Sequence, residues 1–210
     1  KCHFGRGLIS NIVIGAVFAV YLLLSKEKIA RQTRDLILAF CSSKRAAYLL
    51  DLGNAAHAIF SGYIGGQLLE AFCLGLLCLA GMLLLGLPYA LSISVIVGFL
   101  AIIPIIGTII SALLGLILIG LAAPGKIWLF ILFFFVLQRI EGDVLYPKIV
   151  GKSVGLSEIW VLAAITVGGS LAGVLGIIVS VPVASVLAYI LSANVRQQLQ
   201  QKNIIQEDNA

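Results

Sequence analysis

The sequence predicts an all-α, polytopic integral membrane protein whose helices are interrupted by glycine and proline. Of its 210 residues, 61% are hydrophobic and 11% are charged, whereas a soluble domain carries roughly 25% charged residues. The mean hydropathy is +1.13. Residues 71–125 and 159–195, runs of 55 and 37 residues, contain no Asp, Glu, Lys, Arg or His. Such runs are typical of segments that lie in lipid, and they disfavour a soluble enzyme.

The first predicted span covers residues 1–25. Its uncharged part, residues 7–25, has 19 residues and would form a helix of about 28 Å, which is enough to cross a bilayer core. It ends where Lys26 follows Ser25. Because the chain begins at Lys1 rather than at a methionine, we expect it to be part of a longer protein.

A basic segment, residues 26–70, is predicted to follow this span. Between residues 26 and 51 the sequence has six basic and three acidic residues, and such an excess is typical of cytoplasmic segments. Its apolar residues recur at roughly helical intervals, which predicts an amphipathic helix that lies on the membrane or on the protein. The alternative is an ordinary solvated connector.

The predicted transmembrane core, residues 71–195, begins with the longer uncharged run. A single helix of that length would measure about 80 Å, against a hydrocarbon core of about 30 Å, so the run must fold back on itself. Prolines and glycines mark the breaks. We therefore predict one span over residues 71–87 and a second over residues 89–123 that is broken at Pro104.

The rest of the core is predicted to hold two further spans. Residues 127–140 are rich in aromatic side chains but barely long enough to cross. Residues 139–158 have no net charge, which suits an outer loop. The last span, residues 159–193, is broken by the glycines of residues 168–176 and is expected to bend or re-enter. Residues 196–210 form a polar, cytoplasmic tail.

The two long runs share an interruption near the middle. Broken helices are tolerated at membrane depth where neighbouring protein or a water-filled cavity satisfies the freed backbone groups. Paired interruptions therefore indicate a transport site. The alternative is that the glycines permit close helix packing and the prolines make simple kinks.

Ionisable and amide side chains beside the uncharged runs are the other functional candidates, because such groups are costly in a membrane. Gln138 and Glu141 are three residues apart, which places them on one face of a helix. A partly desolvated carboxylate there could exchange a proton as the protein opens to each side. The alternative is that Arg139, Glu141 and Asp143 are interfacial charges that pair locally and end the helix.

The sequence offers little for other kinds of chemistry. It has no phosphate-binding loop of the G-x-x-x-x-G-K-[ST] type, no zinc-ligand spacing among its four cysteines, and no evident pairing of a nucleophile with a base. We therefore expect no enzyme activity, no cofactor and no metal. The net charge of +5 is attributed to membrane orientation rather than to nucleic-acid binding.

Two motif groups occur in combination. They are Pro104-x-x-Gly107 in the interrupted run, and Gln138-x-x-Glu141-Gly142 followed by Pro147-x-x-x-Gly151-x-x-x-Gly155 and a glycine-rich segment that ends at Val181-Pro182. With these motifs the chain, over roughly residues 62–191, resembles the C-terminal half of the autoinducer-2 exporter family, a broad class of bacterial permeases.

The resemblance implies a multi-pass protein of the bacterial inner membrane that forms a homo-oligomer. Its partners would be the lipid bilayer and a small polar solute or ion. The leading functional hypothesis is secondary export of a small polar solute or signal molecule such as autoinducer-2. Sodium/proton antiport is one alternative, and a structural or regulatory membrane role, for example in sporulation, is another.

Motif and charge together give eleven candidates for the transport pathway or for coupling. They are Gln67, Glu70, Pro104, Gly107, Gln138, Arg139, Glu141, Pro147, Gly151, Gly169 and Gly173.

Overall fold

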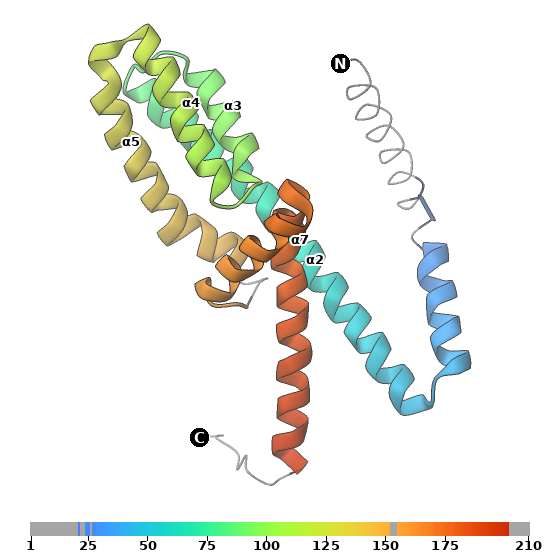
Figure 1. Cartoon of the computed structure of the whole chain (residues 1–210). Coiled ribbons are helices and arrows are strands. Elements are labelled where there is room, and N and C mark those ends of the chain that lie inside the picture. The colour runs from blue at the N-terminus through green and yellow to red at the C-terminus, as the bar shows by residue number, and fades with distance from the viewer. Residues whose placement is uncertain (1–20, 22–23, 26, 152–154, 202–210) are drawn as a thin grey trace. The chain divides into compact units, whose positions relative to one another are not determined.

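The computed structural model is helical, with no β-strand in the residues it describes, so the predicted all-α class is confirmed. The described residues are 21, 24–25, 27–151 and 155–201 (Figure 1). Most of the predicted span over residues 1–25 and the end of the predicted tail lie outside them. Two compact units, residues 1–54 and 55–210, are described separately below.

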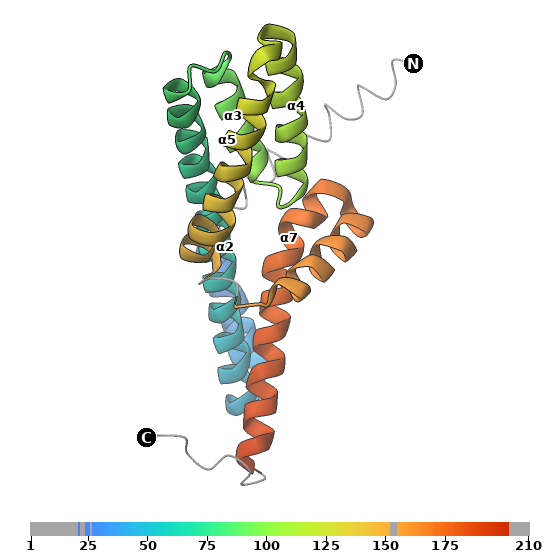
Figure 2. The ribbon, with the colours of Figure 1, turned by 90° about the vertical axis from the view of Figure 1, so that its left-hand side faces the viewer.

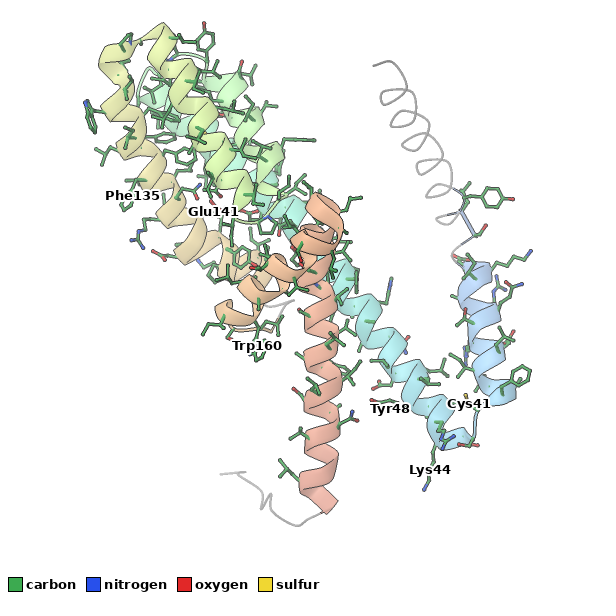
Figure 3. All side chains as sticks on the ribbon, in the orientation of Figure 1. Cys41, Lys44, Tyr48, Phe135, Glu141 and Trp160 are labelled. Atoms are coloured by element: carbon green, nitrogen blue, oxygen red, sulfur yellow. The ribbon has the colours of Figure 1, made fainter. Side chains whose placement is uncertain are left out.

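The described part of the first unit is helical over residues 27–40. A short break at Cys41 and Ser42 follows, and α2 (Ser43–Leu84) begins immediately after it; Figure 3 labels Cys41 in this break and Lys44 just after it. The described basic side chains of this unit are exposed: Lys28, Arg31, Arg34, Lys44 and Arg45.

Helix α2 continues without a break past residue 70, where the sequence predicted the basic segment to end. Gly65 and Gly66 do not interrupt it, because a glycine inside a helix weakens it by only about 1 kcal/mol. The helix is long and apolar enough to cross a membrane. The boundary placed at residue 70 therefore coincides with no change in backbone structure.

Residues 89–123, predicted as a span that is broken at Pro104, form a helical hairpin. Helix α3 (Ala90–Ala101) and helix α4 (Ile106–Ala122) pack against each other on either side of Pro104, as Figure 2 shows. At 1.5 Å per residue the two helices measure about 18 Å and about 26 Å, and each falls short of a 30 Å core. The break at Pro104 thus reverses the chain rather than kinking a single span.

The turn of this hairpin has an unusual backbone. Ile105 has φ 67° and ψ −56°, and the Ile106 amide donates a hydrogen bond to the Pro104 carbonyl at 2.7 Å. This pattern is the rare positive-φ form of the γ-turn, which is strained for a β-branched residue. Proline, which has no amide hydrogen, favours ending α3 just before this turn.

After α4 a single 3₁₀ turn, η1 (Pro124–Lys126), leads into α5 (Ile127–Ile140). The chain then stays helical through two π-helical segments, η2 (Glu141–Leu145) and η3 (Pro147–Gly151). The sequence predicts a loop from residue 139, because the apolar run ends there. The backbone nevertheless continues as a helix, with its wider π-turns beginning at Glu141.

Helix α7 (Glu158–Gln201) consists of two arms joined at Ala172 and Gly173, where the backbone leaves helical geometry. Figure 2 shows the second arm turning back along the first. The arms approach most closely at Gly168 and Gly176, because a Cβ on either would overlap the other's carbonyl oxygen. The predicted break within residues 168–176 therefore forms a second hairpin.

The hydrophobic core of the second unit has two parts. The first lies among α2, α3, α4 and α5, with the side chains of Met82, Ile93, Ile119 and Phe130 fully buried. The second joins α2 to the end of η3 and to both arms of α7; its buried members are Tyr63, Val150, Ile165, Ile177 and Val181. The α3–α4 turn borders the second part through Ile103.

Candidate functional site

A cavity of about 500 Å³ lies where the α3–α4 turn, α2, the end of α5 and the first arm of α7 meet. Five of the candidates predicted from the sequence line it: Gln67, Pro104, Gln138, Glu141 and Gly151. The lining is mainly apolar, with a few polar groups. This composition is typical of small-molecule sites.

Gln67 forms the polar end of this cavity on α2. It is only 4% exposed, and its amide nitrogen donates one hydrogen bond to Glu70 Oε2 at 3.1 Å and one to the Ala101 carbonyl at 2.9 Å. Both amide hydrogens are therefore used, and the side chain ties α2 to the end of α3. Its carbonyl oxygen, Oε1, has no hydrogen-bond partner.

Glu70 accepts the hydrogen bond from Gln67, is 1% exposed and is not among the residues that line the cavity. Its Oε1 has no hydrogen-bond partner. The buried carboxyl group thus has one oxygen that accepts a hydrogen bond from Gln67 and one oxygen without a partner.

Glu141 follows α5 directly, opens η2 and lines the cavity; Figure 3 labels it. Gln138, one turn earlier, interacts with this carboxylate but completes no hydrogen bond through its Nε2. Glu141 Oε2 is also unpartnered. Burial raises the pKa of Glu141 above its ordinary value, because desolvation disfavours the charged form.

Unsatisfied buried polar atoms mark this region of the structure. In the described part of the chain they are Tyr63 Oη, Gln67 Oε1, Glu70 Oε1, Gln138 Nε2 and Glu141 Oε2. An unpaired buried polar group costs about 1–3 kcal/mol, so a cluster of them suggests that a solute, a proton or an ion completes the site. No described Lys, Arg or His forms an ion pair with Glu70 or Glu141.

The remaining candidates lie elsewhere. Gly107 packs against the Leu100 carbonyl at the closest approach of α3 and α4. Arg139 is exposed, with its guanidinium carbon 5.4 Å from the centre of the Phe135 ring. Pro147 begins η3 outside the cavity lining.

The two glycines from α7 are structural in this arrangement. Gly169 faces Ile177 across the α7 hairpin, and Gly173 forms the bend at its tip. Neither lines the cavity.

Sequence reasoning missed several lining residues. Tyr146 reaches the cavity because the chain remains helical after Glu141, and Thr108 does so from the first turn of α4. Val161 and Ile165 line it from the first arm of α7. Hydropathy cannot identify such residues, since it marks them only as part of an apolar run; the position of Thr108 beside the Pro104-x-x-Gly107 motif was the one available signal.

The comparisons with known proteins agree with the motifs. A family model described as AI-2E family transporter matches residues 4–196. The chain is 30% identical over 185 residues to the putative transport protein YrrI of Bacillus subtilis. The aligned region covers 87% of this chain and 51% of YrrI. It is 26% identical over 203 residues to the putative transport protein YueF of the same organism, covering 96% of this chain and 55% of YueF.

A more distant match is the putative permease PerM of Escherichia coli, which is 25% identical over 135 residues, covering 63% of this chain and 38% of PerM. The chain thus spans about half the length of the curated relatives matched over most of it. No solved structure matches. Because the family model covers nearly the whole sequence, the resemblance inferred from the motifs is confirmed, and the chain belongs to the AI-2E family of transporters.

Proposed function

We propose that the protein is a secondary permease that exports a small polar solute through the cavity beside Glu141. The observation that carries this proposal is that one cavity brings together the broken-helix turn at Pro104, Gln67 and Glu141. Relatives described as putative transport proteins and permeases support a membrane transport role. We further propose that the full-length protein is a multi-pass homo-oligomer in the bacterial inner membrane.

The size and chemistry of the cavity suit a small solute. Its volume of about 500 Å³ lies in the range of about 300–1,000 Å³ that is usual for small-molecule sites. Gln67 Oε1 and Glu141 Oε2 are acceptors without partners, so a solute that brings O–H or N–H donors would satisfy them. A dry, tightly packed interior would instead have favoured the structural or regulatory alternative.

Glu141 is the group best suited to link the solute to a proton. As a carboxylate it offers only acceptors, whereas the protonated acid also offers a donor and carries no charge. A change of protonation therefore changes the affinity of the cavity for a solute, and the solute changes the affinity for the proton by the same factor. This reciprocal coupling is what a proton-driven exporter requires.

The test uses the full-length protein in everted membrane vesicles with an imposed proton gradient and autoinducer-2 as the first solute. The variant Glu141→Gln removes the titratable group while keeping nearly the same shape. Asp143→Asn is the matched control, because Asp143 is exposed on the same π-helical segment and does not line the cavity. Both substitutions replace a carboxyl group with an amide of nearly the same size.

We expect gradient-driven accumulation in wild type and in Asp143→Asn, and accumulation in Glu141→Gln that no longer responds to the gradient. If Glu141→Gln accumulates the solute in response to the gradient as wild type does, Glu141 has no part in coupling. If neither wild type nor any variant transports autoinducer-2 but the vesicles accumulate other small polar solutes, autoinducer-2 is not the exported solute. The proposal that export proceeds through the cavity then still stands.

A specific observation also supports the sodium/proton alternative. Gln67 Oε1, Glu70 Oε1 and Glu141 Oε2 are unpartnered oxygen atoms, and oxygen ligands are what hard cations prefer. In the same vesicles without solute, antiport predicts that added sodium releases protons across the membrane, and that Glu141→Gln abolishes this release. Solute export predicts no sodium response.

A further inference from the structure

We propose that Gln67 is a specificity-determining residue of the cavity, and that its Oε1 selects solutes by accepting a hydrogen bond from a solute hydroxyl group. This inference rests on the proposed function in that the cavity is taken as the place where the solute binds. It adds the chemical class of the solute, a polyol, and the protein atom that distinguishes this polyol from an analogue without the hydroxyl.

The orientation of the Gln67 amide is fixed by its partners. The two ends of a glutamine amide are similar in shape, but the oxygen accepts hydrogen bonds and the nitrogen donates them. The Gln67 nitrogen lies 2.9 Å from the Ala101 carbonyl oxygen, which can only accept. A reversed amide would bring two acceptors together there. The nitrogen therefore stays with Ala101 and with Glu70 Oε2, and Oε1 is the end left for another partner.

Oε1 also lies deep in the protein. The Gln67 side chain is 4% exposed and lines the cavity, and Oε1 is its one polar atom without a partner. Because both amide hydrogens are used within the protein, the side chain offers a solute only an acceptor. An unpaired buried acceptor is unfavourable, so a hydrogen-bond donor is the feature of a solute that matches this site.

The other polar side chains described along the cavity leave this acceptor unpaired. Thr108, Gln138, Glu141 and Tyr146 line the cavity, and none of them donates a hydrogen bond to Gln67 Oε1. Gln138 Nε2 and Glu141 Oε2 are themselves buried and without partners. The described lining thus combines unpaired acceptors with an unpaired donor.

A polyol matches this combination. A hydroxyl group both donates and accepts hydrogen bonds, whereas an ammonium group only donates. A molecule with several hydroxyls can therefore pair with both kinds of group. The apolar part of the lining, which includes Val161 and Ile165 from α7, suits the carbon chain of the same molecule.

The hydroxyl that pairs with Gln67 is expected to control affinity. If hydrogen replaces it, Oε1 stays unpaired in the complex, and a site built to hydrogen-bond a hydroxyl rejects the analogue for this reason. A buried polar group without a partner corresponds to a loss of about 5- to 150-fold in affinity.

Equilibrium binding to the full-length protein in detergent tests this proposal without a transport step. Glycerol, erythritol and ribitol, which are polyols of increasing length, are first titrated into wild type and followed by calorimetry. The polyol that binds most tightly is then compared with its deoxy analogues, in which one hydroxyl at a time is replaced by hydrogen.

Two variants of α2 introduce the same new side chain. Gln67→Met removes the acceptor while nearly keeping the length of the side chain. Ile64→Met is the matched control, because Ile64 lies about one turn earlier on α2, is exposed and does not line the cavity. Thermal unfolding of each variant reports whether it is folded.

We expect wild type and Ile64→Met to bind at least one of the polyols. We also expect one deoxy analogue to bind them about 5- to 150-fold more weakly than its parent polyol does. In Gln67→Met the analogue and the parent should bind equally, because the atom that distinguishes them is absent. The parent polyol should lose affinity for Gln67→Met by a similar factor.

Three results would overturn the proposal. Two are measured on wild type alone and do not depend on whether Gln67→Met folds: none of the polyols binds, or every deoxy analogue binds as tightly as its parent. The third is a preference for the hydroxyl that is undiminished in Gln67→Met.

Binding and transport can fail separately. If the preference for the hydroxyl depends on Gln67 but vesicles accumulate no solute, Gln67 recognises the polyol and the proposed export fails. If vesicles export a solute in response to the gradient but Gln67→Met keeps the preference, export stands and the proposed role of Gln67 fails.

Discussion

Gly107→Ala tests how closely the two arms of the α3–α4 hairpin approach. A Cβ at Gly107 would overlap the carbonyl oxygen of Leu100, which is a backbone atom of α3 and cannot rotate aside as a side chain could. Overpacking of this kind costs about 1–3 kcal/mol. The higher helix propensity of alanine offsets about 1 kcal/mol of this cost. Because the overlapped atom belongs to the backbone, we take the upper end of the overpacking range, about 3 kcal/mol. The expected net loss in the free energy of unfolding is then about 2 kcal/mol.

Gly65→Ala is the same chemical change with the opposite expected sign. Gly65 lies inside α2, and a Cβ there would meet nothing within 4 Å. Only the propensity term remains, so the variant should gain about 0.5–1 kcal/mol.

Thermal unfolding of the full-length protein in detergent measures both variants. With about 2–4 °C per kcal/mol for a cooperative unit of about 150–250 residues, Gly107→Ala should lower the Tm of the unit that contains it by roughly 4–8 °C and Gly65→Ala should raise it by roughly 1–4 °C. A Tm for Gly107→Ala equal to or above that of Gly65→Ala would refute the close packing of the hairpin.

Three further predictions concern the turns and the carboxylate. Gly173→Ala should lower the free energy of unfolding by about 1–3 kcal/mol, and with it the Tm, because glycine adopts φ 59° and ψ −139° readily and alanine does not. An unchanged Tm would mean that the α7 arms are joined differently. Ile105→Gly should cost less stability than Ile106→Gly, because only Ile105 has a strained positive φ that glycine relieves; an equal or larger loss would contradict the γ-turn. Glu141→Gln should raise Tm by an amount that grows as pH rises above 4.5. The raised pKa of Glu141 means that the folded state binds the proton more tightly than the unfolded chain, so wild type loses stability with rising pH and the glutamine variant does not. A Tm difference that shrinks with rising pH would show that the Glu141 carboxylate is stabilised in the fold.

Much of the fold follows from physical rules that a sequence alone reveals. The uncharged runs are too long for one crossing, and Pro104 and Gly173 lie where the structure reverses direction. Hydropathy could not show that these breaks make hairpins, because a proline kink and a reversal have the same sequence signature. The difference depends on the positive φ of Ile105 and on glycine contacts between the arms.

The candidate site was predictable only in part. Gln138 and Glu141 could be placed on one face by their spacing, and the structure does bring both to the cavity. The hydrogen bond from Gln67 to the Ala101 carbonyl could not be foreseen, since it depends on how α2 packs against the end of α3. The helical continuation after Ile140 was missed for a related reason, because charged residues and Gly142 resemble a loop when the tertiary contacts are unknown.

The central claim is that Glu141 couples solute movement through the cavity to a proton. Gradient-driven accumulation of autoinducer-2 in everted vesicles, compared between Glu141→Gln and Asp143→Asn, tests it most directly. The account predicts that Asp143→Asn responds to the proton gradient as wild type does, while Glu141→Gln shows no response. A full gradient response in Glu141→Gln would contradict the claim.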